Sequence, residues 1–113
     1  MSSPDDIRWI AVVPSTELVP ETPREVVIDE DILVLIRYGD NIGAYQGLCP
    51  HQFARLSDGQ VVDGHLNCPR HMARFRLSDG ACGPGWSLPP LHRFAVKEEG
   101  GMVHISLQSP KEN

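Results

Sequence analysis

The sequence predicts an all-β fold. Short segments rich in β-branched residues recur along the chain, clusters of Gly, Pro, Asn and Asp separate them, and no segment has a convincing helical pattern. A length of 113 residues suits one domain that buries a core without the help of disulfides. We therefore expect a single domain over residues 1–113, built from antiparallel strands.

Four strands are expected before the first cysteine. Ile7–Val12 is the first, and Pro14 ends it and opens at most a single helical turn. Arg24–Ile28 and Asp31–Tyr38 then form a hairpin, and Ile42–Gln46 follows after a second turn. The third of these segments contains a run of five apolar residues, which is typical of a strand buried on both faces. A short buried helix has the same pattern, but the length and the β-branched content favour a strand.

The second half of the chain is expected to add a hairpin, a loop and two strands. Asp63-Gly64 is a signal for a tight hairpin turn. The segment 81–90 is too rich in Gly and Pro for regular structure, so we expect a shaped loop. Leu91–Lys97 and Met102–Leu107 form the last two strands, joined by a turn at Glu98–Gly101. In the final strand the odd-numbered residues are predicted to face the core, with Met102, His104 and Ser106 turned outward.

Two short motifs carry the chemistry of the sequence. Cys49-Pro-His51 is followed, after a gap of sixteen residues, by Cys68-Pro-Arg-His71. Thiolates and imidazoles are the donors that zinc and iron-sulfur clusters prefer. The residues Leu-Ser-Asp-Gly follow each motif, at 56–59 and at 77–80, which predicts two equivalent loops closed by equivalent turns. The Asp63-Gly64 hairpin reverses the chain between the loops and should bring them together.

The distribution of the four ligands separates the two kinds of metal site. A zinc finger groups two Cys in one place and two His in another, whereas here each loop contributes one of each. This arrangement favours a two-iron cluster in which Cys49 and Cys68 hold one iron and His51 and His71 hold the other. A structural or regulatory zinc module stays open as the alternative.

The motifs resemble those of a known family. Cys49-x-His51 and Cys68-x2-His71, followed by Phe75 and a Gly/Pro-rich loop, look like the Rieske-type ferredoxins of bacterial multicomponent oxygenases. The run 44–52 looks most like the ferredoxins of toluene-type di-iron monooxygenases. The resemblance implies stacked antiparallel sheets, a small cluster-binding subdomain at about 44–86, and one 2Fe-2S cluster. It also implies that the loop over 83–90 covers the cluster. For Trp86 in this loop three roles stay open: shielding the cluster, contacting a partner, or packing in the core.

The resemblance also bears on the reduction potential. High-potential Rieske proteins of respiratory complexes carry a Ser and a Tyr where this chain has Ala73 and Phe75, and a loop-bridging disulfide where it has Ala54 and Arg70. Hydroxyl hydrogen bonds to the cluster raise its potential, and Rieske potentials span roughly −150 to +300 mV. We therefore expect a potential in the lower part of that range.

The function implied is electron transfer rather than catalysis. The chain has no dinucleotide fingerprint and no second metal constellation, so we expect a carrier and not an enzyme. By resemblance the donor is a flavin-containing NAD(P)H reductase. The acceptor is the terminal oxygenase of a hydrocarbon- or aromatic-hydroxylating system, with a di-iron hydroxylase favoured and a Rieske dioxygenase possible. An accessory reductase subunit of the same fold is the second alternative, although such subunits typically lack the four ligands.

Charge and composition exclude other partners and set the compartment. The net charge is −5 without a Lys/Arg run, so nucleic acids and anionic membranes are poor partners. No apolar run is long enough to span a membrane, and no signal peptide is recognisable. With two cysteines as ligands Cys82 has no disulfide partner, so we expect a cytoplasmic protein. Four arginines in or beside the ligand segments could steer the chain onto an acidic partner: Arg55, Arg70, Arg74 and Arg76.

Overall fold

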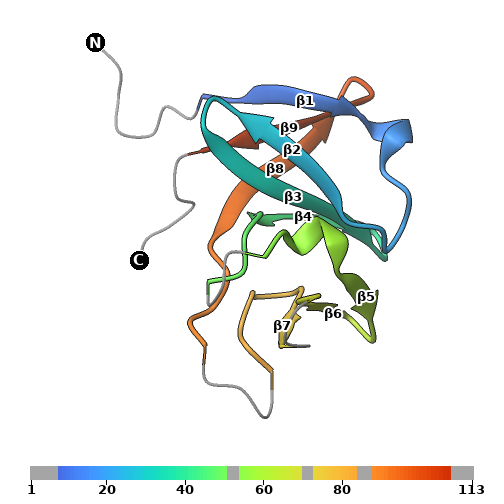
Figure 1. Ribbon diagram of the computed structural model, residues 1–113. Coiled ribbons are helices and arrows are strands. Elements are labelled where there is room, and N and C mark those ends of the chain that lie inside the picture. Colours follow the sequence, from blue (N-terminus) through green and yellow to red (C-terminus); the bar gives the residue numbers. More distant parts are fainter. Residues whose placement is uncertain (1–7, 51–53, 70–72, 84–87, 108–113) are drawn as a thin grey trace.

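The computed structural model describes residues 8–50, 54–69, 73–83 and 88–107, and these form two antiparallel sheets. In the six-stranded sheet the spatial order is β1 (Ile10–Pro14), β9 (Met102–Ser106), β8 (Arg93–Glu99), β4 (Asn41–Gln46), β3 (Asp31–Tyr38) and β2 (Arg24–Ile28) (Figure 1). In the smaller sheet the order is β5 (Gln60–Val62), β6 (His65–Asn67) and β7 (Arg74–Arg76). Two 3₁₀ helices, η1 (Ser15–Glu17) and η2 (Leu56–Asp58), complete the described elements. The all-β prediction is confirmed.

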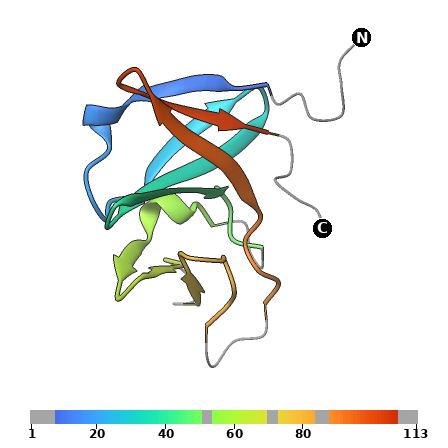
Figure 2. The same cartoon turned by 180° about the vertical axis from the view of Figure 1, so that it is seen from behind.

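The two sheets form separate layers. Figures 1 and 2, which view the molecule from opposite sides, both place the three-stranded sheet below β4. The chain leaves the larger sheet at the end of β4 and forms the smaller sheet. It then returns to the larger sheet through the segment before β8. Among the described residues, no helix is long and apolar enough to cross a membrane.

The central hairpin has the predicted bounds, and the first strand does not. β2 and β3 begin and end where the sequence pattern placed them. β1 begins at Ile10 and includes Pro14, whereas we expected a strand from Ile7 that stops before the proline. A proline is tolerated there because β1 is an edge strand of the sheet, where one row of backbone N–H groups has no neighbour to pair with. The predicted helical turn after it is η1.

The last two strands also differ from the expectation. β8 begins at Arg93 and runs to Glu99, so the turn into β9 contains only two residues, Gly100 and Gly101. Both have positive φ angles, 62° and 78°, which a two-residue hairpin turn of this hand requires. Ser106, predicted to face outward, is fully buried.

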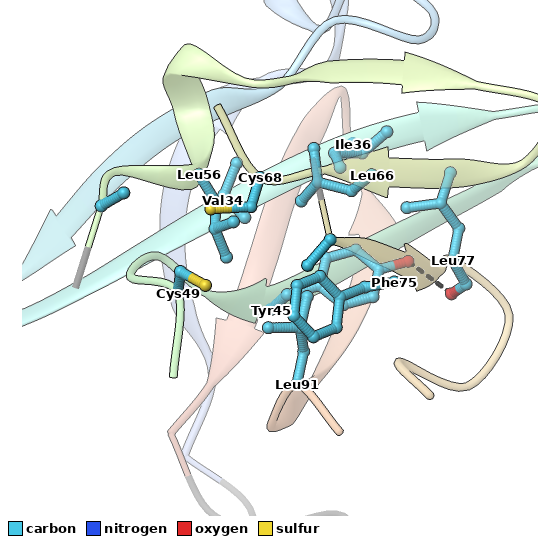
Figure 3. Packing of buried hydrophobic residues seen from close by; sticks show 12 residues of the cluster. Val34, Ile36, Tyr45, Cys49, Leu56, Leu66, Cys68, Phe75, Leu77 and Leu91 are labelled. Atoms are coloured by element: carbon cyan, nitrogen blue, oxygen red, sulfur yellow. Dashed lines mark hydrogen bonds between the residues drawn. The ribbon is translucent and has the colours of Figure 1, made fainter. Parts of the chain in front are cut away.

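β3 is buried on both faces, as its apolar run predicted, and it separates two cores. Alternate residues point to opposite sides of a strand. One core, here called the sheet core, contains Val13, Leu18, Leu33, Leu35, Ala44, Val103 and Ile105. The other, here called the interface core, contains Val34, Ile36, Tyr45, Cys49, Ala54, Leu56, Leu66, Cys68, Ala73, Phe75, Leu77 and Leu91 (Figure 3).

Tyr45 connects the two sheets at the interface core. Its hydroxyl donates a buried hydrogen bond of 2.6 Å to the carbonyl oxygen of Leu77, just after β7 (Figure 3). The half-buried Tyr38 donates to the same oxygen at 3.3 Å. The Tyr45 ring lies along its own strand, and a Cβ at Gly43 would collide with the hydroxyl. Burial raises the pKa of Tyr45 far above its ordinary value, so the hydroxyl keeps its proton and remains a donor.

Replacing this hydroxyl should loosen the contact between the sheets. We expect Tyr45→Phe to lower the free energy of unfolding by about 1–2 kcal/mol, because a buried acceptor loses its short hydrogen bond. Guanidinium unfolding of the purified protein measures the change. Tyr38→Phe is the matched control and should cost less, because its bond is longer and only part-buried. Equal effects of the two substitutions would contradict the role given to Tyr45.

Candidate metal centre

The two predicted ligand cysteines sit on loops that are closed in the same way. Cys49 follows β4 and Cys68 follows β6. The backbone N–H of Cys49 donates to the carbonyl of Ala54 at 2.9 Å, and that of Cys68 donates to the carbonyl of Ala73 at 2.8 Å. Each bond spans five residues, so each loop encloses one of the predicted histidines. His51 and His71 themselves lie outside the described residues.

The sequence contains a signal for this common closure. Both loops read Cys-Pro-x3-Ala, with the alanine at the position whose carbonyl accepts the bond. Both alanines are buried, at 9% and 0% exposure for Ala54 and Ala73, so the closing residue has to be small. The prediction of two equivalent loops is therefore confirmed. The evidence is the pair of backbone bonds to Ala54 and Ala73, whereas the prediction used the repeated Leu-Ser-Asp-Gly segment.

The two Leu-Ser-Asp-Gly segments are not equivalent turns, and that part of the prediction is wrong. The first forms η2, and its glycine, Gly59, has a φ of −84°. The second is a turn whose glycine, Gly80, has a φ of +79° and donates its N–H to the carbonyl of Arg76 at 2.6 Å. A Cβ at Gly80 would lie 2.7 Å from the carbonyl oxygen of Leu91. The conformation of each turn is therefore set by its tertiary neighbours, such as Leu91 beside Gly80, and not by the four-residue pattern.

The predicted hairpin between the loops is present. Asp63 and Gly64 have φ angles of 52° and 74°, and Val62 pairs with His65 across the turn. Positive φ at both central residues is typical of the hairpin turn that matches the twist of the strands. The hairpin returns the chain, so that Cys68 enters the same interface core as Cys49.

Both thiols are fully buried at one end of that core. Figure 3 shows Cys49 and Cys68 at the end away from Leu77. Among the described residues no group of three or more metal-binding side chains occurs, so further ligands would have to come from the undescribed segments that contain His51 and His71. A buried cysteine can also serve as simple packing. Two of them, on loops with identical closure and in one core, fit a shared metal centre.

Comparison with known proteins identifies the family. The sequence model of the Rieske [2Fe-2S] domain matches residues 8–95, which is most of the chain. The chain belongs to the Rieske family. A Rieske domain carries one [2Fe-2S] cluster, with cysteines on one iron and histidines on the other, so this is its cofactor. The pair of buried thiols fits such a cluster.

The relatives of this Rieske chain include ferredoxins of oxygenase systems. It is 32% identical over 110 residues to the ferredoxin component of the alkene monooxygenase system of Xanthobacter autotrophicus, which covers 96% of this chain and 89% of that protein. It is 29% identical over 102 residues to the ferredoxin subunit of anthranilate 1,2-dioxygenase of Burkholderia cepacia. That alignment covers 88% of this chain and 93% of the relative. A chain from the solved complex of reduced oxygenase and oxidized ferredoxin in carbazole 1,9a-dioxygenase matches with a TM-score of 0.84 and 27% identity. The match covers 95% of this chain and 100% of that chain.

The arginines near the Rieske loops are not all free to meet a partner. Arg55 lies 3.3 Å from a carboxylate oxygen of Glu25, and both Nε and a terminal nitrogen of Arg76 donate to Asp79. The Arg76 bonds, followed by the Ala81 N–H, lower the pKa of Asp79 to about 2. Arg74 is half-buried in β7, and Arg70 lies outside the described residues.

The remaining residues near the Rieske centre have simple surroundings. Cys82 is a free, half-buried thiol that packs against the interface core and pairs with Phe75 across an isolated bridge. A cleft of about 270 Å³ borders the second loop, lined by Asp58, Gly59, Gln60, Asn67, Cys68 and Pro69. Trp86 lies outside the described residues. Gln46, which sequence reasoning did not single out, makes hydrogen bonds with its backbone and both ends of its side-chain amide beside the first loop.

Proposed function

We propose that this chain is a Rieske ferredoxin that carries single electrons from a flavin-containing NAD(P)H reductase to the terminal oxygenase of a multicomponent system. One observation carries the proposal: two identically closed loops bury a cysteine each in one core of a Rieske domain whose full-length relatives are named oxygenase ferredoxins. The oxygenase would hydroxylate a hydrocarbon or aromatic substrate. The chain is the electron-transfer component and not the enzyme.

The ligand set follows from the two loops. Cys49 and Cys68 hold one iron and His51 and His71 hold the other, while the backbone closures at Ala54 and Ala73 keep each loop in shape. The cluster supplies one-electron redox chemistry. We assign residues 44–86 as the unit that binds it, within a single Rieske domain over 1–113. With Cys49 and Cys68 as ligands, Cys82 has no disulfide partner, which supports a reducing compartment that we take to be the cytoplasm.

The partners are assigned at two levels of detail. Relatives named for both a monooxygenase and a dioxygenase support an oxygenase as acceptor. A di-iron hydroxylase is our preferred acceptor, on the likeness of residues 44–52 to ferredoxins of toluene-type systems. A carrier that meets two partners in turn needs contacts that dissociate quickly, which suits interfaces below about 1,200 Å².

Iron content and electron paramagnetic resonance test the function and the ligands together. We expect the purified protein to be coloured, to contain a two-iron cluster with a Rieske signal when reduced, and to pass electrons from a reductase to an oxygenase in stopped-flow mixing. Cys68→Ser should lose the cluster, whereas Cys82→Ser, the matched control, should keep it, because Cys82 lies on another segment. A colourless zinc protein would overturn the proposal.

The reduction potential should lie in the lower part of the Rieske range. Ala73 and Phe75 are fully buried and carry no hydroxyl. The hydroxyl of Tyr45 in the interface core already donates its hydrogen bond to the carbonyl of Leu77. We expect a midpoint at or below roughly 0 mV, and Ala73→Ser should raise it by adding a hydroxyl to the second loop. A redox titration measures both. A wild-type midpoint above about +150 mV would contradict this reading.

Arg74 is the described arginine best placed to meet an acidic partner. Its neighbours Arg55 and Arg76 already have acidic partners in the chain. We expect Arg74→Glu to raise the apparent KM of the oxygenase for the ferredoxin and to change its dependence on salt, because the substitution reverses a steering charge. Arg24→Glu is the control, with the same change of net charge in β2 of the other sheet and the loss of only an exposed ion pair. Equal effects of the two would show that only net charge matters.

A further inference from the structure

Gln46 is the last residue of β4, and it makes three hydrogen bonds at the entrance to the first ligand loop. Its backbone N–H donates to the carbonyl of His92 at 2.8 Å. Its side-chain Oε1 accepts from the backbone N–H of His92 at 2.7 Å. Its side-chain Nε2 donates to the carbonyl of Leu48 at 2.8 Å. Both ends of one amide are therefore used at once.

The side chain takes the place of a backbone group. In an antiparallel ladder, two hydrogen-bonded residues exchange both N–H···O bonds through their backbones. β4 and β8 pair at Ala44 with Phe94 and at Tyr45 with Arg93, which places Gln46 opposite His92. Here the His92 N–H goes to the Gln46 side chain. This substitution lets the main chain leave the ladder with β8. On the other edge of β4 the next residue, Gly47, still donates to the carbonyl of Ile32 at 2.8 Å, in register with the pairing to β3.

The groups that Gln46 connects belong to different parts of the centre. Leu48 immediately precedes Cys49, the cysteine of the first loop. His92 immediately precedes β8, and its neighbour Leu91 is held by an N–H bond of 2.8 Å to the carbonyl of Gly80. One side chain therefore ties the residue before Cys49 to the residue before β8.

We propose that Gln46 is a positioning residue that holds the start of the first ligand loop, at Leu48, to His92 just before β8, and so limits the access of water to the cluster and sets its reduction potential. The proposal rests on Cys49 as a ligand, which is part of the proposed function. Its bonds are exposed or part-buried, so water can replace them at small cost in global stability. Their effect is on the position of the loop, because the backbone bond from the Gln46 N–H to the His92 carbonyl remains in a side-chain variant while the Leu48 carbonyl loses its link to β4.

An amide is the group that fits this position. Glutamate would still accept from the His92 N–H, but it has no donor for the Leu48 carbonyl. Methionine has a similar length and makes neither bond well. Gln46→Glu and Gln46→Met therefore remove one or both side-chain bonds. Gln60→Met is the matched control, because Gln60 is exposed and lines the cleft beside Cys68 without such a clamp.

Three measurements on the cluster-loaded protein test the proposal: the rate of cluster loss to an iron chelator, the midpoint potential and the melting temperature. For Gln46→Met we expect cluster loss to accelerate by about threefold to tenfold, the factor for one or two such bonds. Its potential should rise, because water stabilises the more negative reduced state. Gln46→Glu should lose the cluster at an intermediate rate, and Gln60→Met should behave as wild type.

The outcomes separate this inference from the proposed function. If Gln46→Met matches Gln60→Met in rate and potential, the positioning role is wrong although the ferredoxin function stands. If cluster loss follows the melting temperature in step across all variants while the potential stays constant, Gln46 is only structural and the inference also fails. If the wild-type protein gives no Rieske signal, the proposed function itself has failed.

Discussion

Because the side chains from Leu33 to Ile36 are all fully buried, β3 cannot face water on either side and requires a packed layer on each. Leu33 and Leu35 pack in the sheet core, which also contains Val103 and Ile105 of β9. Val34 and Ile36 are covered by the interface core, which includes both predicted ligand cysteines. Each such aliphatic side chain contributes about 1.5–3 kcal/mol when it is buried. The candidate metal centre therefore lies on the apolar face of β3 that carries Val34 and Ile36, which has to be covered for the sheet to be stable.

This arrangement explains how short loops hold two thiols without a helix. The three-stranded sheet is small, with three residues in each strand, and has little stability of its own. It is held by the apolar face of β3 and by the Tyr45 bond to Leu77. The loops then need only backbone closures, at Ala54 and Ala73. A rigid base with short loops suits a carrier, since little has to rearrange when an electron arrives.

The sequence predicted those features that local chemistry decides. The bounds of β2 and β3 follow from apolar runs and turn residues, and the Asp63-Gly64 hairpin follows from the backbone freedom that its turn requires. The resemblance of the two Cys/His motifs to those of the Rieske family predicted the family, and the match of the Rieske domain to residues 8–95 confirms it. The prediction failed where distant neighbours decide. Gly80 adopts positive φ against Leu91, while Gly59 in the same four-residue pattern does not.

Gln46 shows the same limit at the candidate site. Nothing in a glutamine at the end of a strand indicates that its amide will replace a backbone carbonyl, because the partner His92 lies 46 positions away in the sequence. The same applies to Ser106, which the alternation along β9 predicts to face outward but which is fully buried. The roles of such residues can be recognised only when their neighbours in the folded structure are known.

The means by which this chain can tune its cluster are correspondingly few. Ala73 and Phe75 offer no hydroxyl, and the Tyr45 hydroxyl donates to Leu77 instead. With side-chain donors absent at those positions, what remains is the placement of backbone amides and the exclusion of water, and both depend on where the loops lie. The first loop is fixed by the closure at Ala54 and, at its entrance, by Gln46. A single amide at the end of β4 therefore carries more weight here than it would in a protein with hydroxyl donors at the cluster.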